Sequence, residues 1–266
     1  MPATRVQGSG RHMIAGTVAA NDLRRRLALA LDFDDSVEAL RWAGRLKDVF
    51  GVVKVGLELF SAAGPSVVAG LVEDGFLVFT DLKLADIPST TRKAARVLGA
   101  LGATYLTVHV FSGPATLRAA VEGFAEGAER AALPAPVTLG VTVLTSEAEA
   151  PWQVLQERVR AAADAGCGGV VCATSDLAVV NEVAPHLVRV VPGIRLAGAG
   201  ADDQMRTSTP GVAFRAGADV LVVGRAVTQA TDPGAAAAAI MAELAAAVST
   251  SGGALRAGPV SPGLSE

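Results

Sequence analysis

Three charged residues follow one another at short spacing directly after a single apolar run. Asp81, Lys83 and Asp86 come after Phe76–Thr80, and Asp86 stands shortly before a proline that suits the first turn of a helix. Alternate side chains of a strand share a face and lie about 6.5 Å apart along it, so we expect Asp81 and Lys83 to point the same way. Because charges at the end of a buried strand are costly unless they are paired, the segment is a candidate active site.

Two earlier apolar runs also carry charged residues at or near their ends. Leu27–Leu31 leads into Asp32, which shares a face with the small residues of the run, and Lys54 interrupts Val52–Leu57 with Glu58 following. If these runs are neighbouring parallel strands of a barrel, their carboxyl ends meet at one mouth. The pattern therefore predicts one site that gathers carboxylates and ammonium groups from three strands. We interpret Glu58 as a charge on the rim rather than as a catalyst.

Short apolar runs alternate with amphipathic helical stretches over most of the chain. The strand candidates are Leu27–Leu31, Val52–Leu57, Phe76–Leu82, Tyr105–Val110, Val137–Leu144, Gly169–Ala173, Val188–Gly193 and Val220–Gly224. The helical candidates begin near Ser36, Ser61, Pro88, Ala115, Trp152, Asp176, Thr209 and Pro233, and the last is expected to end at Val248. The glycines expected to end a helix before the next strand are Gly51, Gly75, Gly102, Gly166 and Gly217.

Eight β/α alternations imply parallel strands joined by right-handed crossovers, and eight is the number that closes a (β/α)8 barrel. A doubly wound open sheet is the alternative, but no Gly-x-Gly-x-x-Gly follows the first strand, which disfavours the dinucleotide-binding version. We therefore predict an α/β protein with a single TIM-barrel domain over residues 23–248. Residues 1–22 are expected to be a native extension or a remnant of cloning, and residues 249–266 a disordered tail.

Composition narrows the class of protein. Hydrophobic residues make up 51% of the chain and charged residues 18%, and the net charge of -3 arises from interspersed acids and bases. The sequence has no long basic face of the kind that binds nucleic acid. We interpret the run Arg24–Arg26 as a solvated lead-in to the first strand. No apolar run reaches the roughly 18 residues of a membrane span, and the N-terminus lacks a signal-peptide core. We expect a cytoplasmic protein with Cys167 and Cys172 as buried free thiols.

Several short motifs occur in order along the chain, each at the end of a predicted strand or in the loop that follows it. They are Leu29-Ala30-Leu31-Asp32, Val53-Lys54-Val55-Gly56, Asp81-x-Lys83-x-x-Asp86-Ile87-Pro88-x-Thr90, Leu144-Thr145-Ser146, Pro192-Gly193-Ile194-Arg195, Asp202-Asp203-Gln204 and Val223-Gly224-Arg225. In this combination the chain resembles the orotidine 5'-phosphate decarboxylase family over about residues 27–233. The resemblance implies a (β/α)8 barrel that converts orotidine 5'-monophosphate to uridine 5'-monophosphate in de novo pyrimidine biosynthesis, without metal or cofactor.

The motif around Lys83 carries the chemistry that the resemblance implies. Lys83 would donate a proton to C6 of the pyrimidine, and its ammonium would favour the developing carbanion. Asp81 would lie near the departing carboxylate, and Lys54 belongs to the same alternating set of charges. In the family the second acid of the motif comes from the neighbouring subunit. A homodimer is therefore implied, in which Asp86 and Thr90 complete the site of the partner.

The remaining motifs imply substrate-binding residues. Asp32 and Lys54 would hydrogen-bond the ribose hydroxyls, Ile87 and Thr90 belong to the same substrate-contacting motif, and Thr145 would meet the pyrimidine ring.

Phosphate binding is expected after the last two strands. Gly224 lets the backbone approach a phosphate, and Arg225 can bind it in a bidentate manner. Gln204 lies in a Gly- and Ala-containing loop, residues 196–208, that is expected to close over the phosphate as a lid. Arg195 precedes this loop and is either a phosphate ligand or part of a salt bridge that anchors the loop.

Two rival functions stay open. A sugar-phosphate decarboxylase or aldol-type synthase on the same barrel shares Asp-x-Lys-x-x-Asp but holds Mg2+, whereas Ile87-Pro88-x-Thr90, Lys54 and Asp203-Gln204 favour the pyrimidine enzyme. A phosphoribosyl-ligand binding protein without activity is the other rival, although such a protein has no need of the proton donor Lys83. The residues that we interpret as structural rather than functional are His109, Trp42 and Trp152, and we expect the two tryptophans to be packing residues of their helices.

Overall fold

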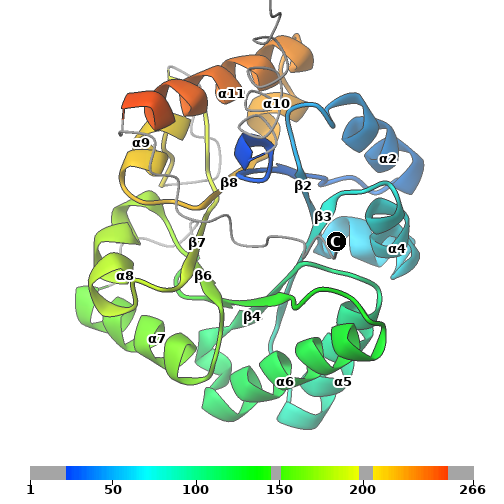
Figure 1. Cartoon of the computed structure of the whole chain (residues 1–266), viewed down its shortest axis with the longest axis vertical. Coiled ribbons are helices and arrows are strands. Elements are labelled where there is room, and N and C mark those ends of the chain that lie inside the picture. Colours follow the sequence, from blue (N-terminus) through cyan, green and yellow to red (C-terminus); the bar gives the residue numbers. More distant parts are fainter. Residues whose placement is uncertain (1–21, 145–150, 198–205, 251–266) are drawn as a thin grey trace, which may run out of the picture.

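The computed structural model describes residues 22–144, 151–197 and 206–250 of the chain. In this part, parallel strands close into a barrel in which each strand pairs with its neighbours in sequence and β8 pairs with β1. The strands are β1 (Leu27–Ala30), β2 (Val52–Gly56), β3 (Leu77–Leu84), β4 (Tyr105–His109), β5 (Val137–Val141), β6 (Gly169–Val171), β7 (Val188–Val191) and β8 (Val220–Val223). Figure 1 looks into this barrel, and the predicted (β/α)8 fold is confirmed.

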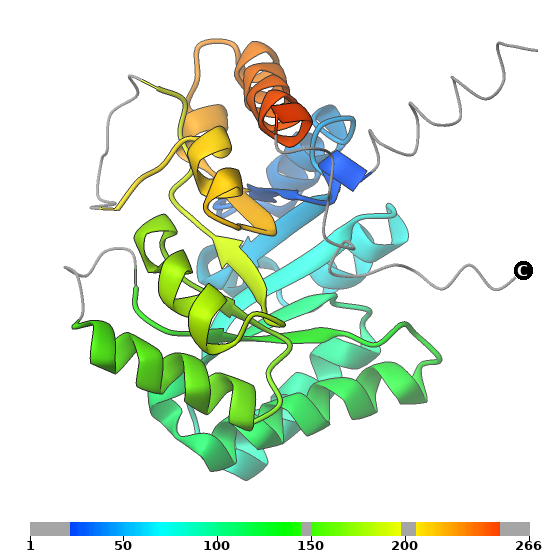
Figure 2. The same ribbon diagram turned by 60° about the vertical axis from the view of Figure 1, so that its left-hand side comes forward.

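The helices surround the ring of strands, as Figure 1 and the turned view in Figure 2 show. They are α2 (Ser36–Arg45), α3 (Leu57–Ala63), α4 (Ser66–Glu73), α5 (Pro88–Ala100), α6 (Pro114–Arg130), α7 (Trp152–Asp164), α8 (Leu177–Val183), α9 (Pro210–Arg215), α10 (Arg225–Thr228) and α11 (Pro233–Thr250), with short 3-10 turns η1 (Val110–Ser112) and η2 (Thr174–Asp176). Local sequence explains several helix starts. The side chain of Asp35 accepts hydrogen bonds from the N–H groups of Val37 and Glu38, at 2.6 and 3.1 Å, and so caps α2.

Two local predictions differ from the structure. One helix was expected from near Ser61 between β2 and β3, but α3 and α4 both occupy this connection. Gly64 has a φ of 66°, a left-handed conformation that costs glycine little, and it ends α3. Among the glycines expected to end helices, Gly51 has no positive φ. A Cβ at Gly51 would instead lie 3.0 Å from the backbone of Arg24, so glycine allows a close approach of the two backbone segments there.

Both faces of the barrel strands are buried. In β1, Leu27 and Leu29 belong to the core between the strands and the helices. Ala28 and Ala30 belong to a second core inside the barrel. The small-residue face of β1 therefore points inward, and Asp32, which follows on that face, reaches the mouth of the barrel as predicted.

Buried charges close the amino-terminal end of the barrel. Arg26, Arg189 and Asp219 are all buried. The Asp219 carboxylate accepts hydrogen bonds from the backbone N–H and Nη1 of Arg189, at 2.9 and 3.1 Å. The backbone carbonyl of Asp219 accepts one from Nη1 of Arg26 at 3.3 Å. The interpretation of the basic run as solvated is therefore wrong for Arg26, because it contacts an acidic residue from a distant part of the sequence.

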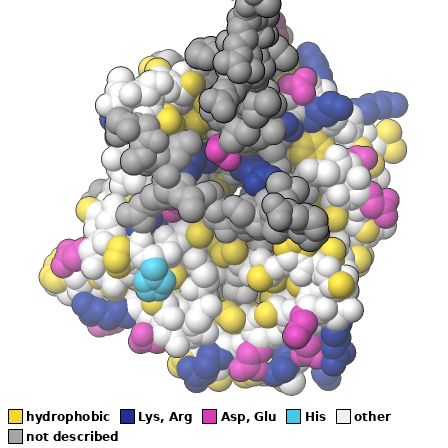
Figure 3. Space-filling view, in the orientation of Figure 1, with side chains coloured by type: hydrophobic (Ala, Val, Ile, Leu, Met, Phe, Trp, Pro, Cys, Tyr) yellow, Lys and Arg dark blue, Asp and Glu magenta, His cyan; other side chains and the backbone are white. Residues whose placement is uncertain are grey.

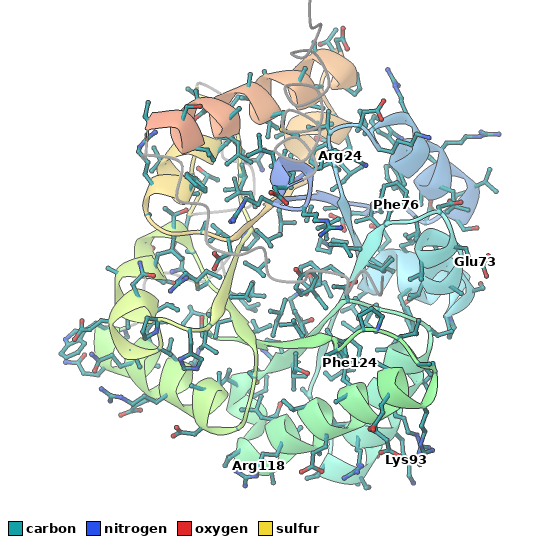
Figure 4. The ribbon with its side chains drawn as sticks, in the orientation of Figure 1. Arg24, Glu73, Phe76, Lys93, Arg118 and Phe124 are labelled. Atoms are coloured by element: carbon teal, nitrogen blue, oxygen red, sulfur yellow. The ribbon has the colours of Figure 1, made fainter. Side chains whose placement is uncertain are left out.

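Helices α5 and α6 approach each other closely through glycine. A Cβ at Gly123 or Gly127 of α6 would lie 2.2 or 2.0 Å from a carbonyl oxygen of α5, so no larger residue fits there. Figure 4 shows Phe124 of the same helix, which is buried, while Lys93 and Arg118 lie exposed on the outer side of the pair. Because α5 begins directly after the charged segment of β3, this packing anchors that segment.

One described helix, α11, is long and apolar enough to cross a membrane by length and composition, with a mean hydropathy of 1.3 over 18 residues. Glycine and polar residues interrupt this helix, so it contains no unbroken apolar run of 18 residues. Its buried residues are spaced along one face and pack against the barrel core; they are Ala237, Ile240, Leu244 and Ala247. The helix ends at Thr250 rather than at Val248. Residues 1–21 and 251–266, which contain most of the two predicted extensions, lie outside the described residues.

Candidate active site

A cavity of about 600 Å³ opens at the carboxyl ends of the strands. In Figure 3, basic and acidic side chains border a hollow near the middle of this face. The predicted site residues that line the cavity are Asp32, Lys54, Asp81, Lys83, Arg195, Gly224 and Arg225. The structure thus brings together residues from the ends of β1, β2, β3, β7 and β8, which are far apart in the sequence.

Four charged side chains form a continuous row across one side of the cavity. Nζ of Lys54 lies 3.0 Å from Oδ1 of Asp32 and 3.7 Å from Oδ2 of Asp81. Nζ of Lys83 lies 2.8 Å from Oδ1 of Asp81. Acid and ammonium alternate along the row, so each charge has an opposite charge beside it. The side chains of Lys54 and Asp81 are 12% and 14% exposed, whereas that of Asp32 is 56% exposed.

The electrostatics of the row keep its central pair ionised. Burial alone would lower the pKa of Lys54, but the nearby carboxylates of Asp81 and Asp32 outweigh it and the pKa is raised. Burial alone would raise the pKa of Asp81, but the ammonium groups of Lys54 and Lys83 outweigh it and the pKa is lowered. At neutral pH the site therefore holds a fixed carboxylate and a fixed ammonium in contact.

Strand β3 does not enter this site as a regular strand. Its pairing with β4 changes register: Thr80 pairs with Leu106 and Leu84 pairs with Val108, so β3 has two extra residues between these pairs. Such a bulge redirects side chains, and within it Lys83 has a φ of 48°, a left-handed conformation that lysine rarely adopts. Asp81 and Lys83 do meet as predicted, but simple alternation along a strand is an incomplete reason for it.

Thr107 of β4 links the two charged residues of the bulge, although nothing in its local sequence marks it. Its Oγ1 accepts a hydrogen bond from the backbone N–H of Lys83 at 2.9 Å and donates one to Oδ1 of Asp81 at 3.0 Å. Thr107 is fully buried. Threonine is common in strands, so only the pairing of β4 with the bulge reveals this contact.

Gly56 at the end of β2 provides space for one of the ion pairs. A Cβ at this position would lie 3.1 Å from Nζ of Lys54 and 3.2 Å from Oδ1 of Asp32. A Cβ here would therefore crowd both side chains of this ion pair, and they would have to shift slightly. The motif Val53-Lys54-Val55-Gly56 contains this glycine, but its role follows only from the geometry.

Two arginines border the cavity on the side of β7 and β8. The backbone N–H of Arg195 donates a hydrogen bond to the carbonyl of Ser208 at 2.9 Å, and the N–H of Ser208 donates one to the carbonyl of Gly193 at 3.1 Å. These bonds join the two ends of the loop after β7. Arg225 follows Gly224 at the start of α10. Both arginines therefore come from positions just after the ends of strands, and the backbone of Arg195 is held by these hydrogen bonds.

Thr145, Gln204 and the middle of the predicted lid lie outside the described residues. Arg206, which follows the lid, donates hydrogen bonds to both carboxylate oxygens of Asp176, at 2.8 and 2.9 Å, and to the carbonyl of Leu144 at 3.0 Å. This arginine therefore connects the residue before Thr145 with the turn after β6.

Asp86, Ile87 and Thr90 are not among the described residues that line the cavity of this chain. All three are exposed, and Ile87 is 64% exposed. The Asp86 carboxylate accepts a hydrogen bond from the N–H of Ile87 at 2.6 Å, and its backbone carbonyl accepts bonds from the hydroxyls of Thr91 and Thr116. The segment is thus held in place with its side chains exposed.

The residues interpreted as structural behave differently from one another. Trp42 packs partly against the core, and His109 is half-buried and stacks on Phe111 with ring centroids 4.3 Å apart. Trp152 is 56% exposed at the start of α7, so the expectation that it packs is wrong. Both cysteines are buried free thiols, as predicted.

Among the described residues that line the cavity, three carry a carboxylate, namely Asp32, Glu58 and Asp81. Asp32 and Asp81 both contact Lys54, whose ammonium lies between them. Within the described ranges, no group of three or more His, Cys, Asp or Glu side chains is arranged to hold a metal ion.

Comparison with known proteins agrees with the fold and the motifs. Residues 25–240 match the family model described as the orotidine 5'-phosphate decarboxylase / HUMPS family. The chain is 45% identical over 230 residues to the orotidine 5'-phosphate decarboxylase of Nitratidesulfovibrio vulgaris, which covers 83% of this chain and 97% of the relative. It is also 45% identical over 230 residues to that of Anaeromyxobacter dehalogenans, with 82% of this chain and 98% of the relative covered.

A solved structure is similar as well. The crystal structure of orotidine 5'-phosphate decarboxylase from Lactobacillus acidophilus matches with a TM-score of 0.70 and 32% identity, covering 83% of this chain and 99% of the other. The barrel, the order of its strand-end motifs and these matches lead to one assignment. The chain belongs to the orotidine 5'-phosphate decarboxylase / HUMPS family.

Proposed function

We propose that this chain decarboxylates orotidine 5'-monophosphate to uridine 5'-monophosphate, a step of de novo pyrimidine biosynthesis. Relatives with 45% identity carry the name of that enzyme, whereas the matched family model is broader. The observation that carries the proposal is the row of alternating charges formed by Asp32, Lys54, Asp81 and Lys83. A single catalytic domain over residues 23–248 and a cytoplasmic location are part of the same proposal.

The proposed chemical step needs a proton and electrostatic stabilisation at one carbon atom. Breaking the bond between C6 and the carboxyl carbon releases CO2 and leaves the bonding electron pair on C6. The ammonium of Lys83 then gives a proton to C6, and water returns a proton to the amine. The contact of 2.8 Å with Asp81 supports this role, because it holds the ammonium in one orientation before the reaction begins. Asp81 would stand beside the departing carboxylate.

The rest of the cavity supports one orientation of the nucleotide. Asp32 and Lys54, which are 3.0 Å apart, would bind the ribose hydroxyls. Arg195 and Arg225, on the opposite side of the cavity, would bind the phosphate through charge-assisted hydrogen bonds. The remaining assignments are Thr145 to the pyrimidine ring and Gln204 and Gly224 to the phosphate.

We propose that turnover requires neither metal nor cofactor. The ammonium of Lys54 already lies between two carboxylates, at a position where a metal-dependent enzyme would need those oxygens for its cation. Dialysis against EDTA should therefore leave the turnover of orotidine 5'-monophosphate unchanged. Loss of turnover that added Mg2+ restores would favour the sugar-phosphate enzyme instead.

The direct test follows the absorbance change as orotidine 5'-monophosphate is converted, with no metal added. Lys83→Ala should abolish turnover, while uridine 5'-monophosphate still binds in a calorimeter. Lys93→Ala, on the exposed side of α5, is the matched control and should behave as wild type. Nucleotide binding by the wild type without CO2 release would favour a binding protein, and near-normal turnover by Lys83→Ala would remove this residue as the proton donor.

A second copy of the chain is proposed to complete the site. Asp86, Ile87 and Thr90 are exposed outside the cavity of their own chain, which supports a role in the site of a partner. Mixing Asp86→Asn protein with Lys83→Ala protein should recover activity, because one of the two sites in each heterodimer then has both residues. If heterodimers form and no activity returns, the shared site is wrong.

A further inference from the structure

We infer that Thr107 is a positioning residue, which holds the proton donor Lys83 and the carboxylate of Asp81 in one fixed arrangement. The inference rests on the proposed function, because it concerns the orientation of the residue assigned as proton donor. Thr107 is fully buried and is not among the described residues that line the cavity. It therefore acts through the two charged residues rather than by touching the substrate.

The hydroxyl of Thr107 closes a ring of hydrogen bonds. It accepts the backbone N–H of Lys83 at 2.9 Å and donates its proton to Oδ1 of Asp81 at 3.0 Å. The same oxygen of Asp81 accepts a hydrogen bond from Nζ of Lys83 at 2.8 Å. A hydroxyl has one proton to donate. Because Thr107 gives this proton to Asp81, its oxygen lone pairs are left to accept the backbone N–H of Lys83. The two bonds together fix the carboxylate of Asp81 and the backbone of Lys83 relative to each other.

This ring matters because Lys83 has an uncommon backbone conformation. Its φ of 48° falls within the stretch where β3 changes register against β4. A residue other than glycine keeps such a conformation only where its surroundings determine it. The hydroxyl of Thr107 binds the backbone of Lys83 and the partner of its ammonium at once. Loss of this hydroxyl would leave the ammonium free to adopt other positions relative to C6.

Three variants separate positioning from stability. Thr107→Val removes the hydroxyl and keeps the shape of the side chain, whereas Thr107→Ser keeps the hydroxyl. Thr80→Val is the matched control, because Thr80 is a fully buried threonine of β3 whose hydroxyl donates to the carbonyl of Tyr105 at 2.8 Å. Thr80 is likewise not among the described cavity-lining residues, and its hydroxyl bonds a backbone carbonyl of β4 rather than the backbone of Lys83 or the carboxylate of Asp81.

The measurements are kcat for orotidine 5'-monophosphate, the Kd of uridine 5'-monophosphate and the melting temperature. For Thr107→Val we expect kcat to fall on the order of 100-fold, the effect of a misplaced catalytic group, with little change in Kd. Thr107→Ser should recover most of kcat. Thr80→Val should lower the melting temperature to a similar extent as Thr107→Val while keeping the wild-type kcat.

Near-normal kcat in Thr107→Val, or an equal fall in Thr80→Val, would overturn the inference. If Thr107→Val does not fold, Thr107→Ala is assayed in its place, and a wild-type kcat for that variant would overturn it equally. Absence of turnover by the wild type would refute the proposed function instead, so the two failures are distinguishable.

Discussion

Replacing Asp81 by asparagine removes the central negative charge of the site, and we expect the free energy of unfolding to fall by about 3–5 kcal/mol. The carboxylate lies 2.8 Å from Nζ of Lys83 and 3.7 Å from Nζ of Lys54. At an effective dielectric constant of about 20, these separations correspond to attractions of about 6 and about 4.5 kcal/mol. Burying the carboxylate costs several kcal/mol, and because asparagine is uncharged the variant does not incur this cost. The net loss stays large because two ammonium groups are left with less compensation.

Asp32→Asn is the control for this prediction, because it makes the same chemical change next to the same lysine. The side chain of Asp32 is 56% exposed and lies 3.0 Å from Lys54, so its contribution should be about 0–1 kcal/mol. Urea unfolding at neutral pH measures both variants, and the midpoint should fall by roughly 1–3 M for Asp81→Asn and much less for Asp32→Asn. Equal losses would refute the reasoning, since burial would then not decide the contribution of these charges.

Four further predictions concern pH, packing and the closed end of the barrel. The pKa of Asp81 is lowered from its ordinary value of 3.8, so the ionised carboxylate stabilises the folded protein above about pH 3.8. This contribution is lost as the pH falls through the lowered pKa. The difference in free energy of unfolding between wild type and Asp81→Asn should therefore shrink in acid. The pKa of Lys54 is raised from its ordinary value of 10.5, so its ammonium stabilises the folded protein below about pH 10.5 and this contribution is lost as the pH rises through the raised pKa. A free energy of unfolding that increased above pH 10.5 would contradict this prediction. Gly127→Ala should lower the free energy of unfolding by about 1–3 kcal/mol, and with it the melting temperature, because its Cβ would lie 2.0 Å from a carbonyl oxygen. Gly44→Ala, which has open space around it, should leave the melting temperature unchanged. Asp219→Ala should cost about 3–5 kcal/mol in urea unfolding, because it leaves buried arginines without their carboxylate, and a loss below about 1 kcal/mol would disprove that.

The convergence of the site could be predicted because it follows from the architecture. Parallel strands of a barrel bring their carboxyl ends to one face, so Asp32, Lys54 and Asp81 had to meet once their strands were recognised. The alternation of small and large residues in Leu27–Ala30 placed Asp32 on the small-residue face, which the structure turns into the barrel. These inferences use only local patterns and one general rule of topology.

Other features depend on pairings between distant segments, which a local pattern does not contain. The bulge of β3 exists only in register with β4, and Thr107 gains its role from that register. Arg26 belongs to a basic run of a kind that usually lies in solvent, but it contacts Asp219, 193 positions further along the chain. In both cases the chemistry of a side chain is set by a neighbour that the sequence around it does not reveal.

The two sides of the cavity differ in charge, and under the proposed function this difference orients the substrate. On the side of β1 to β3, acids and ammonium groups alternate and nearly cancel. On the side of β7 and β8, the described lining residues include Arg195 and Arg225 but no Asp or Glu. The phosphate is the more highly charged end of the nucleotide, so it has lower energy beside the arginines, and this directs the carboxylate of the ring toward Asp81 and Lys83. Because these charges are held in place before the substrate arrives, little reorganisation is needed when charge develops on C6.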